Sequence, residues 1–137
     1  MPPLILVVDD EPTVRALFRT ALACGGYATR EAATAEEAIA LLGEGLRPAG
    51  VFLDLRMPGS GGLGFLLHLR AMPRGQRLPV AVITGDSSLD PTTRSAVESL
   101  GATVHYKPLD VDDITVVARR LVSRRRPPAA ARARLVG

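Results

Sequence analysis

Three apolar runs recur along the chain, and a polar side chain follows each of them. The runs occupy residues 4–8, 51–53 and 79–83, and the residues that follow are Asp9, Asp54 and Thr84. Continuous runs of this kind are typical of strands buried on both faces, which occur in parallel sheets covered by helices. Such a strand has no place for a carboxylate, so we expect each acid at the carboxyl end of its strand, where it can leave the core.

Segments with helical periodicity separate these runs. Apolar residues at the 0, 3, 4, 7, 8 spacing predict one helix through residues 14–22 and another through residues 114–122. A helix beginning near Pro91 has only a thin apolar stripe, and residues 73–76 are expected to form a loop. A further helix is expected over about residues 62–72, and its apolar residues are Leu63, Leu66, Leu67 and Leu69.

Polar residues mark helix starts and the outer strands. Thr34 and Glu37 have the spacing of a capping box that opens a helix. Residues 27–32 and 103–106 mix polar and apolar side chains, so we expect them to form strands at the sheet edges. The last helix has three candidate caps, which are Asp110, Asp112 and Asp113.

Five predicted strands therefore alternate with five predicted helices. This alternation demands an α/β fold, a parallel sheet with right-handed crossovers and helices on both faces. With the three apolar strands central, the strand order is 2-1-3-4-5, the flavodoxin-like, doubly wound (βα)5 arrangement. Ligands bind such sheets beyond the carboxyl ends of strands one and three. Asp9, Asp10 and Asp54 are predicted to meet there.

Length and composition indicate a single domain without disulfides. The 137 residues include one cysteine, Cys24, and no apolar run long enough to span a membrane. The first apolar run is also too short for a signal peptide, so we expect a cytoplasmic protein.

The basic charge of the chain is concentrated at its carboxyl end. Of the 17 basic residues, five are arginines after Ser123, which leaves 12 basic against 14 acidic residues in 1–123, a net charge of −2. We predict that residues 1–123 form the domain and that residues 124–137 are a disordered tail or linker. No DNA-reading fold follows, so nucleic acid is not an expected partner of this chain alone.

The predicted site has the chemistry of phosphoryl transfer. Converging carboxylates repel one another unless a cation binds, and an all-oxygen set favours Mg²⁺ over zinc. Lys107, after the fifth strand, can counter an anion, and Thr84 offers it a hydroxyl. Together these groups indicate transfer to Asp54, giving an aspartyl phosphate. The simpler alternative makes Asp10 a helix cap and Asp54 a turn residue.

Four short motifs lie at the ends of predicted strands. They are Val8-Asp9-Asp10-Glu11, Leu53-Asp54-Leu55-Arg56-Met57-Pro58-Gly59, Ile83-Thr84-Gly85 and Lys107-Pro108. These motifs resemble the receiver domain of two-component response regulators, and together they span nearly all of residues 4–123. The Asp10-to-Asp54 and Asp54-to-Thr84 intervals, 44 and 30 residues, also fit that family.

The resemblance implies a role for each motif residue in a signalling switch. Asp54 would accept a phosphoryl group from a histidine kinase or phosphotransfer protein, and the domain would catalyse only its own phosphorylation and dephosphorylation. Asp10, Asp54 and the backbone carbonyl of Arg56 would ligate Mg²⁺, with Asp9 acting through water. Lys107 would pair with the phosphoryl oxygens.

Other implied features concern the response to phosphorylation. Thr84 would move toward the phosphoryl group, the Lys107-Pro108 bond would be cis, and the face of helix four, strand five and helix five would change its binding. Arg56 and Asp86 lie two residues after the acceptor and the threonine, at positions that influence loss of the phosphoryl group. They are expected either to form a lid or to be independent surface charges.

The sequence departs from the family at one position. Receivers usually carry Tyr or Phe three residues before the lysine, and here that residue is Val104. His105 and Tyr106 are the candidate substitutes. We expect Tyr106, next to Lys107, to point to the opposite face of the strand from Val104.

Two rival functions follow from the same residues. A pseudo-receiver would be a constitutive interaction module that keeps the fold without the chemistry. A haloacid-dehalogenase-like phosphatase also uses an Asp and Mg²⁺, but it needs a second acid two residues after the nucleophile, where Arg56 stands. For a receiver, the expected partners are a kinase or phosphotransfer protein and either a protein target or a fused output domain, with a homodimer as a further possibility.

Overall fold

The computed structural model describes residues 2–57, 61–85 and 89–124. It contains a five-stranded parallel sheet in the order β2-β1-β3-β4-β5, as the sequence predicts. Pro58, Gly59, Asp86 and the residues after Arg124 lie outside the described residues. The strands are β1 (Leu4–Val8), β2 (Ala28–Ala32), β3 (Gly50–Leu53), β4 (Val80–Thr84) and β5 (Thr103–Tyr106).

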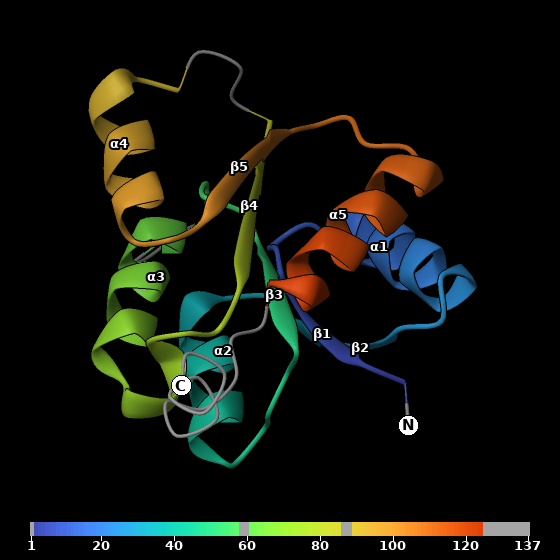
Figure 1. Ribbon diagram of the computed structural model, residues 1–137, viewed down its shortest axis with the longest axis horizontal. Coiled ribbons are helices and arrows are strands. Elements are labelled where there is room, and N and C mark those ends of the chain that lie inside the picture. The colour runs from blue at the N-terminus through green and yellow to red at the C-terminus, as the bar shows by residue number, and fades with distance from the viewer. Residues whose placement is uncertain (1, 58–60, 86–88, 125–137) are drawn as a thin grey trace, which may run out of the picture.

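Helices cover both faces of this sheet. Figure 1 shows α1 and α5 on one side and α2, α3 and α4 on the other. No helix in the described part of the chain is long and apolar enough to cross a membrane. The helices are α1 (Pro12–Cys24), α2 (Ala35–Gly43), α3 (Gly61–Ala71), α4 (Pro91–Ser99) and α5 (Val111–Ser123).

The central strands separate two hydrophobic clusters. Because successive side chains of a strand point to opposite faces, Leu6 and Val8 of β1 join the cluster under α2 and α3, whereas Ile5 and Val7 join the cluster under α1 and α5. All four are fully buried. This two-sided burial explains the apolar runs, and it confines polar residues to the strand ends.

The helix caps differ in part from those predicted. Asp10 is not the N-cap residue of α1. Glu11 occupies the N-cap position, and its side chain makes no capping hydrogen bond. The Asp110 carboxylate accepts a hydrogen bond from the Asp113 amide, and the Asp113 carboxylate accepts one from Asp110, a complete capping box on α5.

At α2 only half of the predicted capping box forms. Thr34 Oγ1 accepts the Glu37 amide at 3.0 Å. The Glu37 carboxylate, however, bonds the amide of Ala33 at 3.0 Å. The second bond therefore closes one residue earlier than a capping box requires.

Three local expectations are wrong. Residues Pro73–Gly75 form a short 3-10 helix, not an irregular loop. On α3, Leu67 is 54% exposed and Phe65 is buried in its place, because a residue two positions before Leu67 lies about 200° away around the helix. On α1, Leu17 lies at the margin of the apolar stripe and is 44% exposed.

Candidate functional site

The acidic residues meet at the carboxyl edge of the sheet. Val8 of β1 pairs with Leu53 of β3, and the next residue on each strand is an acid, Asp9 or Asp54. The Asp54 amide donates to the Val8 carbonyl at 2.9 Å, which continues the ladder to the site. Carboxylate oxygens of Asp9, Asp10 and Asp54 lie within 4.8 Å of one another. The parallel register thus brings together three acids that the sequence analysis singled out.

Asp54 is a buried carboxyl group whose pKa is raised. It is only 5% exposed. Burial, followed by the charges of Asp9 and Asp10, raises its pKa from 3.8 to about 6, although Lys107 and the Arg56 amide act in the opposite direction. The Arg56 amide donates to Asp54 Oδ1 at 3.3 Å. Asp54 therefore remains mostly ionised at neutral pH, but its charge is poorly stabilised.

Lys107 supplies the positive charge of the site. Its ammonium lies 3.0 Å from Asp9 Oδ2 and 3.9 Å from Asp54 Oδ2. It is the only lysine in the sequence. The Lys107 amide bonds the Thr84 carbonyl at 2.8 Å, which joins the ends of β4 and β5, and the Lys107-Pro108 bond is cis, as expected.

A glycine allows the loop after Asp54 to pack against α3. A Cβ added to Gly62 would lie 2.2 Å from the Asp54 carbonyl oxygen and 2.6 Å from the Leu55 Cα. The Gly62 amide also bonds the Leu55 carbonyl at 3.1 Å. The start of α3 therefore contacts the backbone that presents Asp54, and a side chain at this position would displace it.

Thr84 ends β4 with its side chain fully buried. It pairs in register with Tyr106 of β5. Arg56 is exposed, and Asp86, its proposed lid partner, is outside the described residues. The two expectations for this pair, a lid or independent surface charges, therefore stay predictions.

Tyr106 does not point away from Val104, so that expectation is wrong. Val104 packs against the cluster under α2 and α3. The Tyr106 hydroxyl accepts a hydrogen bond from Arg94 Nη1 of α4 at 2.8 Å, and the Arg94 guanidinium carbon lies 5.8 Å from the Tyr106 ring centroid. Residues two apart on a strand share a face, and the prediction ignored this period.

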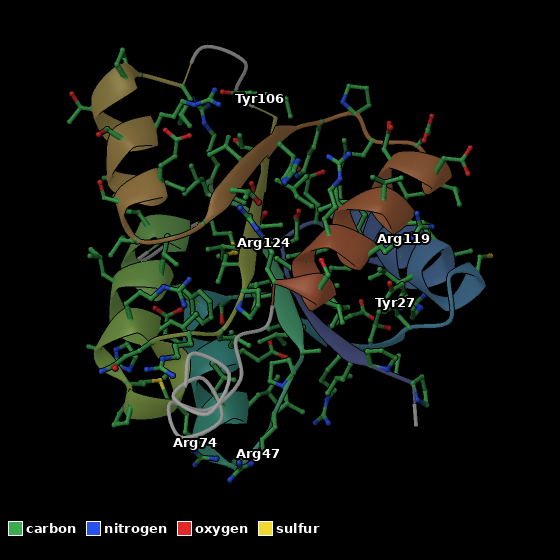
Figure 2. All side chains as sticks on the ribbon, in the orientation of Figure 1. Tyr27, Arg47, Arg74, Tyr106, Arg119 and Arg124 are labelled. Carbon is green, nitrogen blue, oxygen red and sulfur yellow. The ribbon has the colours of Figure 1, made fainter. Side chains whose placement is uncertain are left out.

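His105 occupies the other face of β5. Its Nε2 lies 2.9 Å from Thr103 Oγ1. Burial lowers the pKa of His105, as do the charges of Arg120 of α5 and of Arg124, which follows that helix. Of the two candidate substitutes for the missing aromatic residue, only Tyr106 contacts α4. Figure 2 shows Tyr106 near the carboxyl end of β5, whereas Arg47 and Arg74 lie at the opposite end of the molecule.

The opposite end has an arginine-lined cleft. Its volume is about 550 Å³, and its lining includes Arg70, Arg77 and Arg124. The Arg70 guanidinium donates to the backbone carbonyls of Leu100, Gly75 and Leu78 at 2.6–2.7 Å. Arg70 thus has a structural role, holding the ends of α3 and α4 to the start of β4.

The acidic cluster fits a hard divalent cation. All its donors are carboxylate oxygens, and their mutual repulsion contributes to the raised pKa of Asp54. A cation at this point would remove that repulsion. In the described part of the chain, this is the one group of three or more acids, histidines or cysteines that is close enough to share an ion. Oxygen donors alone favour Mg²⁺ over zinc.

Comparisons with known proteins identify the family of the domain. Residues 5–119 match the family model described as response regulator receiver domain. The chain is 35% identical over 128 residues to response regulator MprA of Mycolicibacterium vanbaalenii, a match that covers 93% of this chain and 53% of that protein. It is 33% identical over 111 residues to sporulation initiation phosphotransferase F of Bacillus subtilis, covering 80% of this chain and 86% of that one.

A solved structure extends the similarity to the fold. A response regulator receiver protein from Pseudomonas putida superposes with a TM-score of 0.78 at 30% identity, covering 88% of this chain and 98% of that one. The chain spans about half the length of MprA. This protein chain belongs to the response regulator receiver domain family, whose members are signalling domains of two-component systems.

Proposed function

We propose that Asp54 accepts a phosphoryl group from a phosphohistidine of a histidine kinase or phosphotransfer protein. The observation that carries this proposal is the meeting of a buried, ionisable Asp54 with Asp9, Asp10 and Lys107 at one edge of the sheet. Scattered structural acids have no reason to converge on one lysine.

The transfer step needs an ionised nucleophile. A carboxylate oxygen of Asp54 attacks phosphorus, the phosphorus–nitrogen bond breaks, and the imidazole nitrogen keeps the electron pair, which leaves an acyl phosphate on Asp54. With a pKa of about 6, about one tenth of Asp54 is protonated at pH 7. Most Asp54 carboxyl groups are therefore in the ionised, nucleophilic form at neutral pH.

The other site residues divide the remaining work. Asp9, Asp10 and Asp54 would hold Mg²⁺, with the Arg56 carbonyl as a backbone ligand and Asp9 acting through water. The ion would supply positive charge for the phosphoryl oxygens during transfer. Lys107 pairs with those oxygens once the phosphoryl group is in place.

The response passes from the site to α4. Thr84 moves toward the phosphoryl group, and Tyr106, its neighbour in register, carries the change to Arg94 on α4. Val97 is the only fully buried residue of α4. Such sparse burial suits a segment of low local stability. The resulting change on the face of α4, β5 and α5 alters binding to a downstream protein, to an output domain or to a second copy of the chain.

The remaining features complete the proposal. Residues 1–123 constitute the receiver domain of a cytoplasmic protein, and residues 124–137 serve as a basic tail or linker. Limited proteolysis followed by mass spectrometry tests this boundary, and resistance of the bonds after Arg124 and Arg125 to trypsin would contradict it.

Intact-mass spectrometry tests the acceptor. The chain is incubated with a phosphorylated phosphotransfer protein or acetyl phosphate, with Mg²⁺ or with EDTA. We expect one Mg²⁺-dependent phosphoryl group on wild type and on the control Asp112→Asn, which changes an exposed acid of α5. Asp54→Asn should gain none, and labelling of that variant would reassign the acceptor. Absence of labelling together with absence of Mg²⁺ binding in wild type would favour the pseudo-receiver.

A further inference from the structure

An arginine outside the motifs contacts the backbone of the acidic pair. Arg15, in the first turns of α1, donates from Nη1 to the Asp9 carbonyl oxygen at 2.7 Å. Its Nε bonds Glu31 of β2 at 3.3 Å. The Arg15 side chain is only 17% exposed. One guanidinium therefore joins α1, the β1–α1 turn and β2.

The bonded carbonyl lies between the two acids. The Asp9 carbonyl belongs to the peptide plane that connects Asp9 to Asp10, so a hydrogen bond to its oxygen restricts the rotation of that plane. The Asp9 amide is also held, by the Ala32 carbonyl at 3.1 Å. Both backbone polar groups of Asp9 are thus connected to the end of β2, one directly and the other through Arg15 and Glu31.

The Asp9 side chain is fixed as well. Its Oδ1 accepts the Glu11 amide at 2.9 Å, and its Oδ2 accepts Lys107 at 3.0 Å. Asp10 lacks this burial and follows the peptide plane that Arg15 holds. The peptide plane that precedes Asp10 is therefore held by Arg15, through the Asp9 carbonyl.

We propose that Arg15 is a positioning residue for divalent-cation binding: its two-point hold on the Asp9 carbonyl and Glu31 sets the orientation of Asp10 beside Asp54. This inference rests on the proposed function, since it concerns the same Mg²⁺ site. Residues that orient metal ligands commonly change metal affinity about 10–100-fold when they are mutated.

Simple electrostatics predicts the opposite sign, which makes the proposal testable. Removing a positive charge near a cation site should strengthen cation binding. Removing a residue that positions a ligand should weaken it. Arg19 provides the matched control, because it bonds the same Glu31 at 2.6 Å but has no contact with Asp9 among the described residues.

The experiment measures Mg²⁺ affinity by NMR amide titration of the 137-residue chain with MgCl₂. Wild type, Arg15→Met and Arg19→Met are compared, and their thermal midpoints in EDTA report the fold without metal. We expect the Mg²⁺ Kd to rise about tenfold in Arg15→Met. In Arg19→Met it should stay within about twofold of wild type, as expected for an exposed ion pair.

Phosphorylation provides a second measurement. In Arg15→Met the rate should need more Mg²⁺ to reach half its maximum but should approach the wild-type plateau, because the nucleophile is intact. If Arg15→Met is unfolded in EDTA, Arg15→Lys replaces it. Lysine keeps the charge but lacks the planar fork that reaches two acceptors at once, so its Kd should also exceed that of wild type.

The outcomes separate the two hypotheses. Wild-type affinity or tighter binding in Arg15→Met, or in Arg15→Lys when that variant is used, overturns the positioning role and leaves the proposed function standing. An equal loss of affinity in Arg19→Met overturns it too, since the effect would then come from Glu31, which both arginines bond. Absence of Mg²⁺ binding in wild type overturns both.

Discussion

Lys107 pairs with Asp9 more closely than with Asp54. The ammonium lies 3.0 Å from Asp9 Oδ2 and 3.9 Å from Asp54 Oδ2. The Lys107 charge thus neutralises Asp9 more than Asp54, which is consistent with the raised pKa of Asp54. In the phosphorylated state proposed here, Lys107 exchanges the Asp9 carboxylate for phosphoryl oxygens.

The pKa of Asp54 makes stability depend on pH. Its folded-state pKa, about 6, exceeds the ordinary value of 3.8, so between these values the folded state binds more protons than the unfolded state. Without Mg²⁺, this group's contribution to stability is fully present below pH 4 and is lost as pH rises through 6. Asp54→Asn should abolish that dependence and raise the free energy of unfolding at pH 7 by on the order of 2–3 kcal/mol. Urea unfolding at several pH values checks this, and Asp112→Asn should behave as wild type.

Lys107→Ala should raise the pKa of Asp54 above about 6, because the lysine charge opposes the effects of burial and the neighbouring acids. A carbon-13 NMR titration of the Asp54 carboxyl group measures it. We expect this variant to stay folded yet lose the response of α4 to phosphorylation. An unchanged pKa would show that Lys107 does not act on Asp54, and an unfolded variant would make the lysine structural.

Mg²⁺ should stabilise the fold through the acidic cluster. A ligand that binds only the folded state raises stability as its concentration exceeds its Kd. The thermal midpoint should therefore rise with MgCl₂ in wild type and in Asp112→Asn but not in Asp10→Asn, as scanning fluorimetry can measure. The same rise in all three would indicate a nonspecific salt effect.

Gly62→Ala should destabilise the domain, because the new methyl group would collide with the Asp54 carbonyl and the Leu55 Cα. Overpacking of this kind costs about 1–3 kcal/mol. Urea unfolding measures the change, with Gly43→Ala as the control, since a Cβ at Gly43 meets nothing within 4 Å. Equal stabilities of the two variants would contradict the close approach of α3 to β3.

The Tyr106 hydroxyl should restrain α4. Tyr106→Phe removes the acceptor of the 2.8 Å bond from Arg94, so α4 amides should exchange hydrogen faster than in wild type, and phosphorylation should change that rate less. Hydrogen-exchange mass spectrometry provides the comparison. Tyr27→Phe serves as the control, because Tyr27 packs against the cluster on the opposite side of the sheet. Unaltered exchange in Tyr106→Phe would contradict the proposal that Tyr106 transmits the change from the site to α4.

Several features were predictable because they depend on local pattern. Burial on both faces of a strand leaves a continuous apolar run, and a parallel sheet places the ends of such runs at one edge. Strand order and the meeting of Asp9, Asp10 and Asp54 follow from these two regularities. The prediction that Leu67 faces the core was wrong, because several apolar stripes are compatible with a leucine-rich helix and only the packing of α3 on the sheet decides which one is buried.

The sequence by itself determined the order of the elements and which residues stand at the strand ends, since both follow from periodicity along the chain. Only the tertiary structure decided which of these residues touch. Lys107 bonds Asp9, which lies 98 residues earlier in the chain, and Tyr106 bonds Arg94 of the neighbouring helix α4. Arg15 reaches Glu31 because α1 packs beside β2. Contacts between distant segments depend on how helices dock on the sheet, and no local pattern encodes that docking.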